Sequence, residues 1–397
     1  MLTLTNLFST PSKTSASLRV LLRLDLNMPL QNNMIMDDSR LVRSLPTINE
    51  LLSKNHKVII LSHFGRPTEV DSRLSLIPIA LNLRKYFTCP ILFATDCVGT
   101  SAKMTIDEAC PGSIIVLENL RYHGGEKSND ASFSMQLCAL GDIYVNDALS
   151  ASHRAHASIV GLPQHLPSYA GRALEAELDA LEGILSHPQM PVMAIVGGAK
   201  ISTKLDLLKN LVSKVNYLVL GGGMANTFLA AQGISVGKSL KEDTLFDDAK
   251  EIMTLAHQHG CSLILPTDAM VSTSLTHKSV RTISIDQMAP TDCIFDVGPE
   301  TLKHIESTMQ SCKTLLWNGP LGVFEIPPYD TSSHRLAEMI SLQTTHGLIS
   351  VAGGGDTLAA LHLAKCQNDL TYTSTAGGAF LEWLEGKTLP GVAALEG

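Results

Sequence analysis

Short runs of apolar residues alternate with helical stretches along this chain of 397 residues. Most of the runs are nearly continuous Val, Ile and Leu, the pattern of parallel strands that are covered on both faces. The strands predicted in the first half are Arg19–Leu24, Lys57–Leu61, Ser113–Leu117 and Asp142–Asn146. Those predicted in the second half are Val192–Val196, Tyr217–Leu220, Ser262–Leu265, Thr314–Trp317 and Leu348–Ala352. The alternation predicts an α/β fold with two doubly wound, Rossmann-like parallel-sheet domains.

A leucine pattern near the middle of the chain predicts a helix that joins the two domains. Four leucines recur there at helical spacing, with acidic residues between them: Leu174, Leu178, Leu181 and Leu185. Prolines precede and follow this stretch. We expect the first domain, residues 1–187, to end in this helix and residues 188–380 to form the second domain.

Composition excludes several classes of protein. Apolar residues make up 45% of the chain and charged residues 17%, which is typical of a folded globular protein rather than a disordered one. The net charge of −8 disfavours a nucleic-acid-binding protein, and no apolar run is long enough to cross a membrane. The N-terminus lacks the pattern of a signal peptide, and predicted structure begins by Val20, so we expect no cleavable leader. The eight scattered cysteines indicate reduced thiols and a cytoplasmic protein.

Basic and polar residues follow the strands of the first half, at the carboxyl ends where parallel sheets bind ligands. They are Asp25, Asn27, His63, Arg66, Arg121, His153, Arg154 and His156, and Arg40 lies shortly after the first strand. One such arginine alone is more often a solvated or paired surface group. Recurrence after four strands favours a basic pocket, and guanidinium groups match the oxygens of a compact phosphorylated acid.

The second half places glycines at the same positions. Four glycine turns follow its strands, at Gly197–Gly198, Gly221–Gly223, Gly353–Gly355 and Gly377–Gly378. Glycine lets backbone N–H groups approach phosphate oxygens at a helix N-terminus. Lys200 and Lys204 are spaced i, i+4 and are expected to share one helical face. These features favour a nucleotide site, whereas SVGKS at Ser235–Ser239 lacks the first glycine of a P-loop.

Two acidic residues complete the expected nucleotide site. Glu325, in the segment WNGPLGVFE, is a candidate acceptor for ribose hydroxyl groups. Asp356, after three glycines, is the candidate Mg²⁺ ligand, because Mg²⁺ commonly takes one carboxylate together with phosphate oxygens. A helix N-cap is the alternative role for Asp356.

At these residues the chain resembles the phosphoglycerate kinase family over nearly its whole length. Nine segments match in the order of the family: LLRLDLNMP, SHFGRP, ENLRY, SHRAHAS, VGGAKISTKL, LGGGMANTFL, WNGPLGVFE, AGGGDT and AFLEWLEGKTLPG. The resemblance implies a monomeric glycolytic enzyme of two lobes. It would transfer a phosphoryl group between 1,3-bisphosphoglycerate and ADP with Mg²⁺, giving 3-phosphoglycerate and ATP. It also implies that residues 381–397 return to the first domain.

The resemblance carries residue roles onto matching positions. The implied acid-binding residues are Asp25, Leu26, Asn27, Arg40, His63, Phe64, Gly65, Arg66, Arg121 and Arg154. The implied nucleotide-binding residues are Lys200, Lys204, Asn318, Glu325, Gly354, Gly355, Asp356 and Thr357, with Asp356 on the metal. The residues expected to act in catalysis are Arg40, Lys200, Gly354 and Gly377.

Three positions depart from the family pattern. Ala376 stands where the family usually has glycine, and it would be strained if its φ were positive. Leu149–Ser152 differs from the usual F-G-T-A, which affects local turn geometry only. Ala176 replaces a common lysine in the linking helix.

The expected chemistry needs no general base, because the attacking carboxylate is already ionised at pH 7. Catalysis then depends on alignment and on neutralising the charge of the transferred group. Two alternatives stay open at this point. One is an ATP-dependent carboxylate–amine ligase, and the other is a two-lobed binding protein without catalytic activity.

Overall fold

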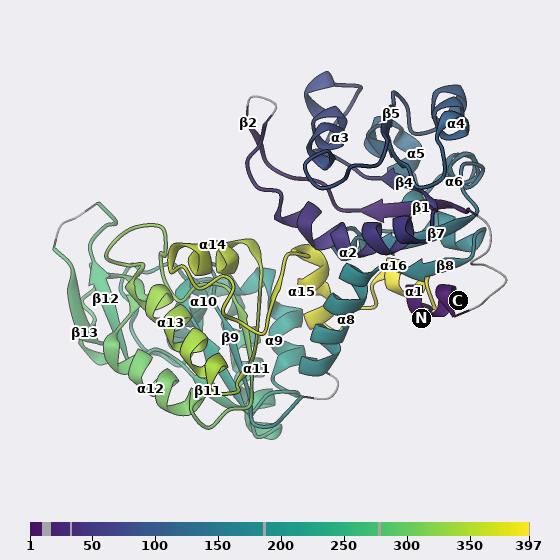
Figure 1. The fold of residues 1–397 in the computed structure, drawn as a ribbon. Coiled ribbons are helices and arrows are strands. Elements are labelled where there is room, and N and C mark those ends of the chain that lie inside the picture. Colours follow the sequence, from purple (N-terminus) through teal and green to yellow (C-terminus); the bar gives the residue numbers. More distant parts are fainter. Residues whose placement is uncertain (10–16, 32–33, 186–187, 277–278, 397) are drawn as a thin grey trace. The chain divides into compact units, whose positions relative to one another are not determined.

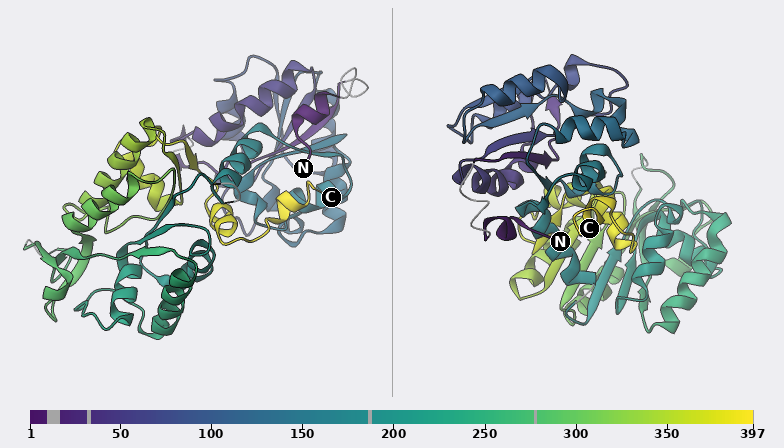
Figure 2. Two further views of the ribbon diagram at one scale, coloured as in Figure 1. Left: turned by 90° about the horizontal axis from the view of Figure 1, so that it is seen from below. Right: turned by 90° about the vertical axis from the view of Figure 1, so that its right-hand side faces the viewer.

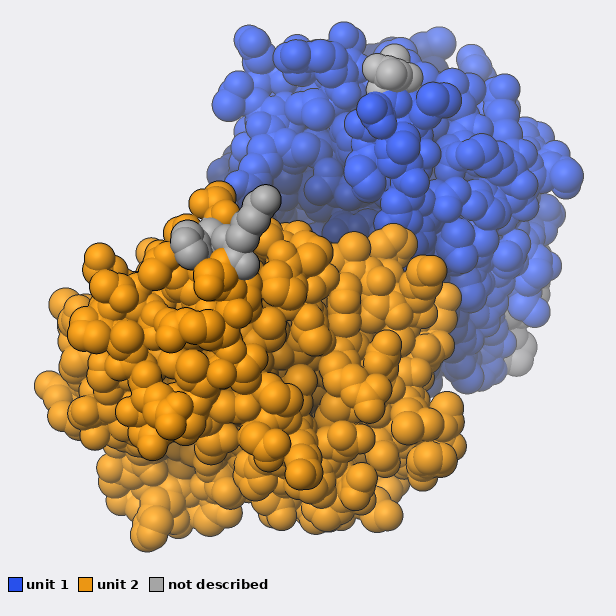
Figure 3. Space-filling view, turned by 90° about the vertical axis from the view of Figure 1, so that its left-hand side faces the viewer, with its two compact units in different colours: residues 1–179, 388–397 blue, residues 180–387 orange. Residues whose placement is uncertain are grey.

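The computed structural model describes residues 1–9, 17–31, 34–185, 188–276 and 279–396, with the elements labelled in Figure 1. The chain forms two compact units, which Figure 3 shows in separate colours. Unit 1 comprises Met1–Asp179 and Thr388–Gly397, and unit 2 comprises Ala180–Lys387. Each unit contains a six-stranded parallel sheet, so the predicted fold class is confirmed.

The parallel sheet of unit 1 has the strand order β5-β6-β4-β1-β7-β8. Its strands are β1 (Arg19–Leu24), β4 (Lys57–Leu61), β5 (Ile91–Ala94), β6 (Ile114–Leu117), β7 (Ile143–Asp147) and β8 (Ser168–Ala170). The bounds of β1 and β4 are as predicted, β6 begins one residue later, and β7 is shifted by one residue. The edge strands β5 and β8 were not predicted. Their runs are short, and three of the four residues of β5 are partly exposed, so neither gives a strong apolar signal.

Helices pack around this sheet (Figure 1). They are α1 (Leu4–Phe8), α2 (Ser39–Ser53), α3 (Ile77–Leu83), α4 (Gly99–Glu108), α5 (Gly124–Ser128), α6 (Ala131–Cys138), α7 (Leu149–Ser152) and α16 (Pro390–Ala393). A two-stranded hairpin, β2 (Leu30–Gln31) and β3 (Met34–Ile35), follows β1. Leu41 and Ile48 of α2 share a fully buried core with Leu22 and Ile60 of the central strands. This packing holds the carboxyl ends of β1 and β4 next to the start of α2.

The helix predicted from the leucine pattern is α8 (Arg172–Leu185). Leu174, Leu178 and Leu181 are buried, as the spacing predicted. A buried side chain from β7 holds the first turn, since the Leu174 N–H donates to Asp147 Oδ1 at 2.9 Å. Burial raises the pKa of the Asp147 carboxyl to about 6. The start of α8 is therefore tied to the sheet of unit 1.

The C-terminal segment packs within unit 1, where α16 contacts α7. In both views of Figure 2 the C-terminal end of the chain lies close to its N-terminal end. Gly391 lies so close to its neighbours that a Cβ there would stand 2.6 Å from Ile159 Cγ2. The segment Ala157–Gly161, a single π-helical turn, forms the other side of this contact. A larger residue at position 391 would therefore disturb the packing of the C-terminus.

The parallel sheet of unit 2 has the strand order β11-β10-β9-β15-β16-β17. Its strands are β9 (Val192–Val196), β10 (Tyr217–Leu220), β11 (Ser262–Ile264), β15 (Thr314–Asn318), β16 (Ile349–Gly353) and β17 (Tyr372–Ser374). The bounds of β9 and β10 are as predicted, and those of β11, β15 and β16 differ by one residue. The edge strand β17 was not predicted, because its three residues YTS carry no apolar run.

The helices of unit 2 are α9 (Leu205–Leu211), α10 (Gly222–Ala231), α11 (Phe246–Gln258), α12 (Pro299–Met309), α13 (Thr331–Thr345), α14 (Gly355–Leu363) and α15 (Gly378–Leu384). Ile305, Leu336 and Leu361, from α12, α13 and α14, share one core with Trp317 and the central strands. Unit 2 also has an antiparallel sheet that the sequence did not predict. Its order is β13-β12-β14, formed by Asp268–Ser272 (β12), Arg281–Ser284 (β13) and Cys293–Val297 (β14).

None of the helices in the described part of the chain combines the length and the apolar character needed to cross a bilayer.

Candidate functional site

The acidic residue that follows β1 is tied to a cation at the start of α2. Asp25 accepts a hydrogen bond from Arg40, and the hydroxyl of Ser150 in α7 donates to the same carboxylate oxygen. The side chain of Asp25 is 13% exposed and that of Arg40 is 32% exposed. The pair therefore positions the Arg40 guanidinium at the edge of the sheet while leaving part of it accessible.

A fully buried arginine lies beneath this edge. Arg23, in β1, is 0% exposed and donates through Nε to Ser158 Oγ at 2.9 Å. Its Nη2 lies 3.0 Å from Nδ1 of His63, the second residue after β4. A guanidinium has only donors, so Nδ1 must accept, and the ring proton of His63 is assigned to Nε2. Arg23 therefore fixes His63 as a neutral ring with a single N–H to offer.

The charge on Arg23 is balanced through a buried relay of hydrogen bonds. Ser158 donates through its hydroxyl to Glu126 at 2.6 Å and through its backbone N–H at 3.0 Å. Glu126 is 0% exposed and lies 3.8 Å from Nδ1 of His156. A buried cation and a buried carboxylate are thus linked through one hydroxyl, and this linkage reduces the cost of burying both charges.

Arg121 is the residue of this cluster that fits an anion-binding site best. It is 8% exposed, and its Nη1 donates to the backbone carbonyl of Gly65 at 2.6 Å. Its Nε is buried and has no hydrogen-bond partner within the described part of the chain. Burial lowers the pKa of Arg121 to about 10, and the nearby charges of Arg154 and Arg23 act in the same direction. An anion bound here would satisfy the free donor and relieve the repulsion between these cations.

Histidines in this cluster are held neutral by their surroundings. Burial, followed by the charges of the neighbouring arginines, lowers the pKa of His156 to about 4. The same two causes lower the pKa of His63 well below its ordinary value. At pH 7 these rings therefore present hydrogen bonds rather than charge, while the arginines supply the positive potential.

The other predicted residues of unit 1 shape the loops of the site. Leu26 and Phe64 are buried, whereas Asn27 and Arg66 are exposed. Asn27 Oδ1 accepts from the Gly65 N–H at 2.8 Å, which ties the loop after β1 to the loop after β4. The structure thus brings Asp25, Asn27, Arg40, His63, Gly65 and Arg121 together at one edge, and Arg154 acts on the same cluster electrostatically.

In unit 2 a partly buried lysine is held by the ends of two strands. Lys204 Nζ donates to the Gly197 carbonyl at 2.7 Å and to Asn318 Oδ1 at 2.6 Å. Asn318 in turn donates to the Gly353 carbonyl at 2.8 Å. Burial lowers the pKa of Lys204 to about 8, partly offset by the charge of Asp356. Lys204 therefore joins the carboxyl ends of β9, β15 and β16.

The prediction that Lys200 and Lys204 share one face of a helix is wrong. Lys200 precedes the 3₁₀ turn Ile201–Thr203, and Lys204 precedes α9, so they do not lie on one α-helix. Lys200 is exposed, whereas Lys204 points into the strand ends because three backbone and amide oxygens hold its ammonium group there. The i, i+4 spacing did not indicate a helix here, because the helix begins only after Lys204.

Of the four predicted glycine turns, three open α-helices of unit 2, whereas Gly197–Gly198 is followed by the 3₁₀ turn Ile201–Thr203 before α9 begins. Gly354, with φ +98°, is the N-cap of α14, and a Cβ there would lie 2.9 Å from Asn318 Nδ2. Gly222, with φ +68°, begins α10, and a Cβ there would lie 2.6 Å from the Gly198 carbonyl oxygen. At α15 the N-cap Gly377 takes the positive φ, and Ala376 does not. Ala376 therefore carries no strain of this kind.

The two acidic residues predicted for the nucleotide site, Glu325 and Asp356, line one pocket. A cavity of about 540 Å³ is bordered by Glu325, Asp356, Gly198 and Gly222, together with apolar side chains such as Leu321. Asp356 lies in the first turn of α14, whose N-cap is Gly354, so the alternative role of Asp356 as an N-cap is wrong. Gly355 begins the same helix, and the buried Thr357 accepts from the Gly319 N–H at 2.7 Å. An apolar cavity with acidic and glycine-lined ends can accommodate a base, a ribose and phosphates.

Several residues of these sites were missed from the sequence. In unit 1 they are Arg23, Glu126 and Ser158, and in unit 2 the buried Asp296 lines the same cavity as Glu325. A charged residue inside the apolar run RVLLRL was a visible signal for Arg23. Nothing in the local pattern marked Glu126 or Ser158, whose contacts join segments 32 residues apart.

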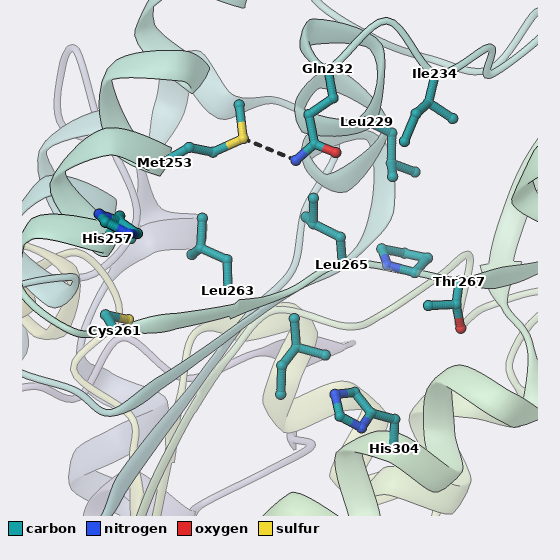
Figure 4. A pocket seen from close by; sticks show the side chains of 13 residues that line it. Leu229, Gln232, Ile234, Met253, His257, Cys261, Leu263, Leu265, Thr267 and His304 are labelled. Atoms are coloured by element: carbon teal, nitrogen blue, oxygen red, sulfur yellow. Dashed lines mark hydrogen bonds between the residues drawn. The ribbon is translucent and has the colours of Figure 1, made fainter.

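A second cavity of unit 2, of about 560 Å³, is of a different kind (Figure 4). Leu229, Met253, Leu263 and Leu265 line it, and Gln232 Nε2 lies 3.1 Å from the sulfur of Met253. Among the described residues, no lysine, arginine or carboxylate lines this cavity, and none of those predicted for the site does so. It therefore does not have the chemistry of a phosphate site.

Comparisons with known proteins agree over almost the whole chain. The family model described as phosphoglycerate kinase matches residues 13–387. A phosphoglycerate kinase from Azorhizobium caulinodans is 51% identical over 382 residues, which are 96% of this chain and 96% of that protein. A second relative of the same name, from Chelativorans sp. strain BNC1, is 52% identical over 387 residues, 97% of each chain.

Solved structures give the same result. Phosphoglycerate kinase from Coxiella burnetii matches with a TM-score of 0.89 and 40% identity, over 98% of this chain and 97% of that one. Phosphoglycerate kinase from Pyrococcus horikoshii matches with a TM-score of 0.81 and 26% identity, over 100% of this chain and 98% of that one.

Proposed function

The chain belongs to the phosphoglycerate kinase family, and from this premise we propose how its two units divide one phosphoryl transfer. The reaction moves a phosphoryl group reversibly between the acyl phosphate of 1,3-bisphosphoglycerate and ADP, giving 3-phosphoglycerate and ATP, a step of glycolysis. The alternative of a carboxylate–amine ligase is not supported, because the relatives that match over nearly the full length carry the kinase name. The alternative of a binding protein without catalytic activity is not supported for the same reason.

We propose that unit 1 binds the phosphorylated acid. The buried Nε of Arg121, which lacks a partner among the described residues, is the observation that carries this proposal. Side chains would provide most of the contacts, since guanidinium groups bind carboxylate and phosphate oxygens with two parallel hydrogen bonds. The proposed residues are Asp25, Leu26, Asn27, Arg40, His63, Phe64, Gly65, Arg66, Arg121 and Arg154.

We propose that unit 2 binds the nucleotide mainly through its backbone. Glycine turns at helix N-termini offer N–H groups to phosphate oxygens, and the helix dipole favours their negative charge. The cavity next to these turns would hold the base and ribose, with Glu325 facing the ribose hydroxyls. The proposed residues are Lys200, Lys204, Asn318, Glu325, Gly354, Gly355, Asp356 and Thr357.

The residues of unit 2 fit a Mg²⁺ ion that arrives with the nucleotide. Asp356 offers an exposed carboxylate at the rim of the cavity, and Mg²⁺ prefers one or two carboxylates together with phosphate oxygens and water. When bound, the ion would neutralise charge on the transferred phosphoryl group. We propose Asp356 as its protein ligand.

The chemistry follows from the charges. The attacking carboxylate of 3-phosphoglycerate is ionised at neutral pH, so no residue needs to remove a proton. We propose that Arg40, Lys200 and the N–H groups around Gly354 and Gly377 stabilise the charge that spreads over the transferred oxygens. Excluding water strengthens each contact, since a charge pair 4 Å apart gains from about 1 to about 4 kcal/mol when the effective dielectric falls from 80 to 20.

Transfer requires that the acid and the nucleotide meet, although different units bind them. We therefore propose that the units close about α8 during turnover. For this motion we propose residues 1–187 as the first domain, 188–380 as the second and 381–397 as the returning C-terminal segment, with boundaries that differ from those of the two compact units. We further propose that the enzyme acts as a monomer in the cytoplasm and binds neither nucleic acid nor a membrane.

A coupled assay tests the proposal directly by following the ATP that forms from ADP and 1,3-bisphosphoglycerate. We expect activity in the wild type and a rise of about tenfold or more in KM for the acid in Arg121→Gln. Arg84→Gln, which changes an exposed arginine of the same unit, is the control and should behave like wild type. Equal acid KM values for all three proteins would contradict the assignment of Arg121.

A further inference from the structure

Three potential metal ligands of different chemistry meet in unit 1, apart from the groups assigned above. Asp96 and Cys97 follow the edge strand β5, and His123 follows the 3₁₀ turn Leu120–Tyr122. One ligand atom from each, a carboxylate oxygen, the thiol sulfur and a ring nitrogen, lies within 4.8 Å of the other two. His123 Nε2 stands 2.7 Å from Asp96 Oδ1. Two distant segments thus place oxygen, sulfur and nitrogen donors around one point.

Neighbouring groups already orient these ligands. The His123 ring stacks on Phe133 with ring centres 5.2 Å apart. Asp96 Oδ1 also accepts from the backbone N–H of Cys97 at 2.6 Å, which restrains the carboxylate. Contacts of this kind orient the ligands in protein metal sites and fix the direction of the imidazole.

Exposure within the cluster leaves a way in from solvent. The Cys97 side chain is fully buried, whereas the side chains of Asp96 and His123 are 44% and 34% exposed. A cation could therefore approach from the side of the carboxylate and the imidazole and reach the sulfur beneath them.

The charges around the thiol favour a cation. The carboxylates of Asp96, Glu126 and Glu118 are the charged groups that act on the Cys97 sulfur. These negative charges would attract a divalent cation, and coordination to a metal favours the thiolate form of cysteine.

We propose that Asp96, Cys97 and His123 bind a thiophilic divalent cation such as Zn²⁺. Sulfur, imidazole and carboxylate ligands suit Zn²⁺ or Co²⁺, whereas Mg²⁺ and Ca²⁺ prefer oxygen ligands alone. Three protein ligands leave a fourth position for water, so the site is exchangeable rather than a closed structural centre. The alternative role of the cluster is a hydrogen bond between Asp96 and His123 over a packed thiol.

The position of the site suggests an effect on acid binding, and this part rests on the proposed function. His123 directly follows the turn that carries Arg121, whose guanidinium binds the Gly65 carbonyl. A bound cation would fix one end of that turn. We expect saturating Zn²⁺ to change KM for the acid in the wild type and to leave KM for the nucleotide unchanged.

A Co²⁺ titration of the full chain tests the site independently of activity. The protein is reduced, treated with a chelator and titrated with Co²⁺, which gives a thiolate-to-metal charge-transfer absorption when cysteine binds it. We expect one equivalent to bind in the wild type, and excess Mg²⁺ should not displace it. Cys97→Ser should abolish the thiolate band, and Cys110→Ser, which removes an exposed thiol, should leave it intact.

A second variant guards against misfolding of the buried Cys97→Ser. His123→Gln changes a partly exposed residue, and we expect it to weaken Co²⁺ binding by about tenfold or more. Absence of the thiolate band in the wild type, or a band that survives in both Cys97→Ser and His123→Gln, would overturn the proposed site. If Co²⁺ binds as expected but Zn²⁺ does not change KM for the acid, the metal site is supported and only its effect on acid binding is contradicted.

Discussion

Unit 1 and unit 2 are built on the same kind of parallel sheet, yet they present different groups at the carboxyl ends of their strands. Unit 1 presents side chains there: Arg40, His63 and Arg121, supported by the buried Arg23. Unit 2 presents glycine turns, with Lys204 holding the strand ends together from beneath. A side-chain site can be weakened by removing one group. A backbone site is weakened instead by adding atoms where glycine leaves room.

The largest expected effect comes from the side-chain site. Arg40→Ala removes a charge that we propose acts on the transferred phosphoryl group, and such losses lower kcat by about 10²–10³-fold. Steady-state kinetics in the ATP-forming direction would measure the change. A kcat close to that of the wild type would contradict a catalytic role for Arg40. Arg84→Ala, which changes an exposed arginine of the same unit, is the control and should have the kcat of the wild type.

Loss of the buried arginine should act through His63. Arg23→Met leaves Nδ1 of His63 without its donor, and an unsatisfied buried group costs about 1–3 kcal/mol. We expect KM for the acid to rise about tenfold, with KM for the nucleotide unchanged, and Arg23→Lys should recover part of the loss. Nitrogen chemical shifts of the His63 ring give a second readout. In the wild type at pH 7, Nδ1 should be unprotonated and Nε2 should carry the proton, because Arg23 donates to Nδ1. A protonated Nδ1 at this pH would contradict the assigned tautomer.

A matched pair of glycines probes the backbone site. Gly222 and Gly260 have similar φ angles, +68° and +70°, so alanine would introduce a strain of about 1–2 kcal/mol at either position. Only at Gly222 would the new Cβ strike a neighbour, the Gly198 carbonyl oxygen at 2.6 Å. We expect Gly222→Ala to raise KM for the nucleotide about tenfold beyond any effect of Gly260→Ala. Equal KM values for the nucleotide in Gly222→Ala and Gly260→Ala would contradict the proposal that the glycine turn at Gly222 binds the nucleotide.

The sequence predicted the central strands of both sheets to within one residue, because they are apolar runs buried on both faces. It did not predict β5, β8 or β17, which are edge strands and carry weak apolar patterns. The antiparallel sheet was also missed, since β13 is mostly exposed and reads as a loop. Arg40 and Asp356 could be proposed from the resemblance, whereas the relay from Arg23 to Glu126 depends on contacts between distant segments.

Acid and base should destabilise the two units in opposite ways. The pKa of His156 is about 4 in the folded protein and 6.5 in the unfolded chain, so unfolding takes up protons between these pH values. The free energy of unfolding therefore falls as the pH drops from 6.5 towards 4. Burial raises the pKa of Asp296 in unit 2 to about 7, from 3.8 in the unfolded chain. The contribution of Asp296 to the free energy of unfolding therefore falls as the pH rises from 3.8 to 7.

Thermal melts of single variants separate these contributions. Relative to the wild type, His156→Gln should lose less stability as the pH falls from 7 to 5, and Asp296→Asn should lose less stability as the pH rises from 5 to 7. Each kcal/mol corresponds to a shift of about 2–4 °C in Tm for units of this size. Parallel pH profiles for the wild type and both variants would contradict these assignments.

The smallest effect concerns a residue where this chain departs from its family. The hydroxyl of Ser150 donates to Asp25, the partner of Arg40. Ser150→Gly, which restores the usual family residue, should change KM for the acid by about threefold, the size of one ordinary hydrogen bond. Ser128→Gly alters an exposed serine of the same unit and should leave this KM unchanged. A KM equal to that of the wild type would show that Ser150 does not help to position the pair.

The central claim is that unit 1 binds the acid and unit 2 binds the nucleotide. Backbone amide NMR of the free protein, titrated separately with 3-phosphoglycerate and with Mg²⁺–ADP, tests it most directly. We predict that the acid first shifts residues 25–27, 63–66, 121 and 153–156, and that the nucleotide first shifts residues 197–204, 318–325 and 353–357. Direct shifts from the acid at the glycine turns of unit 2, with the arginine cluster unchanged, would contradict the account.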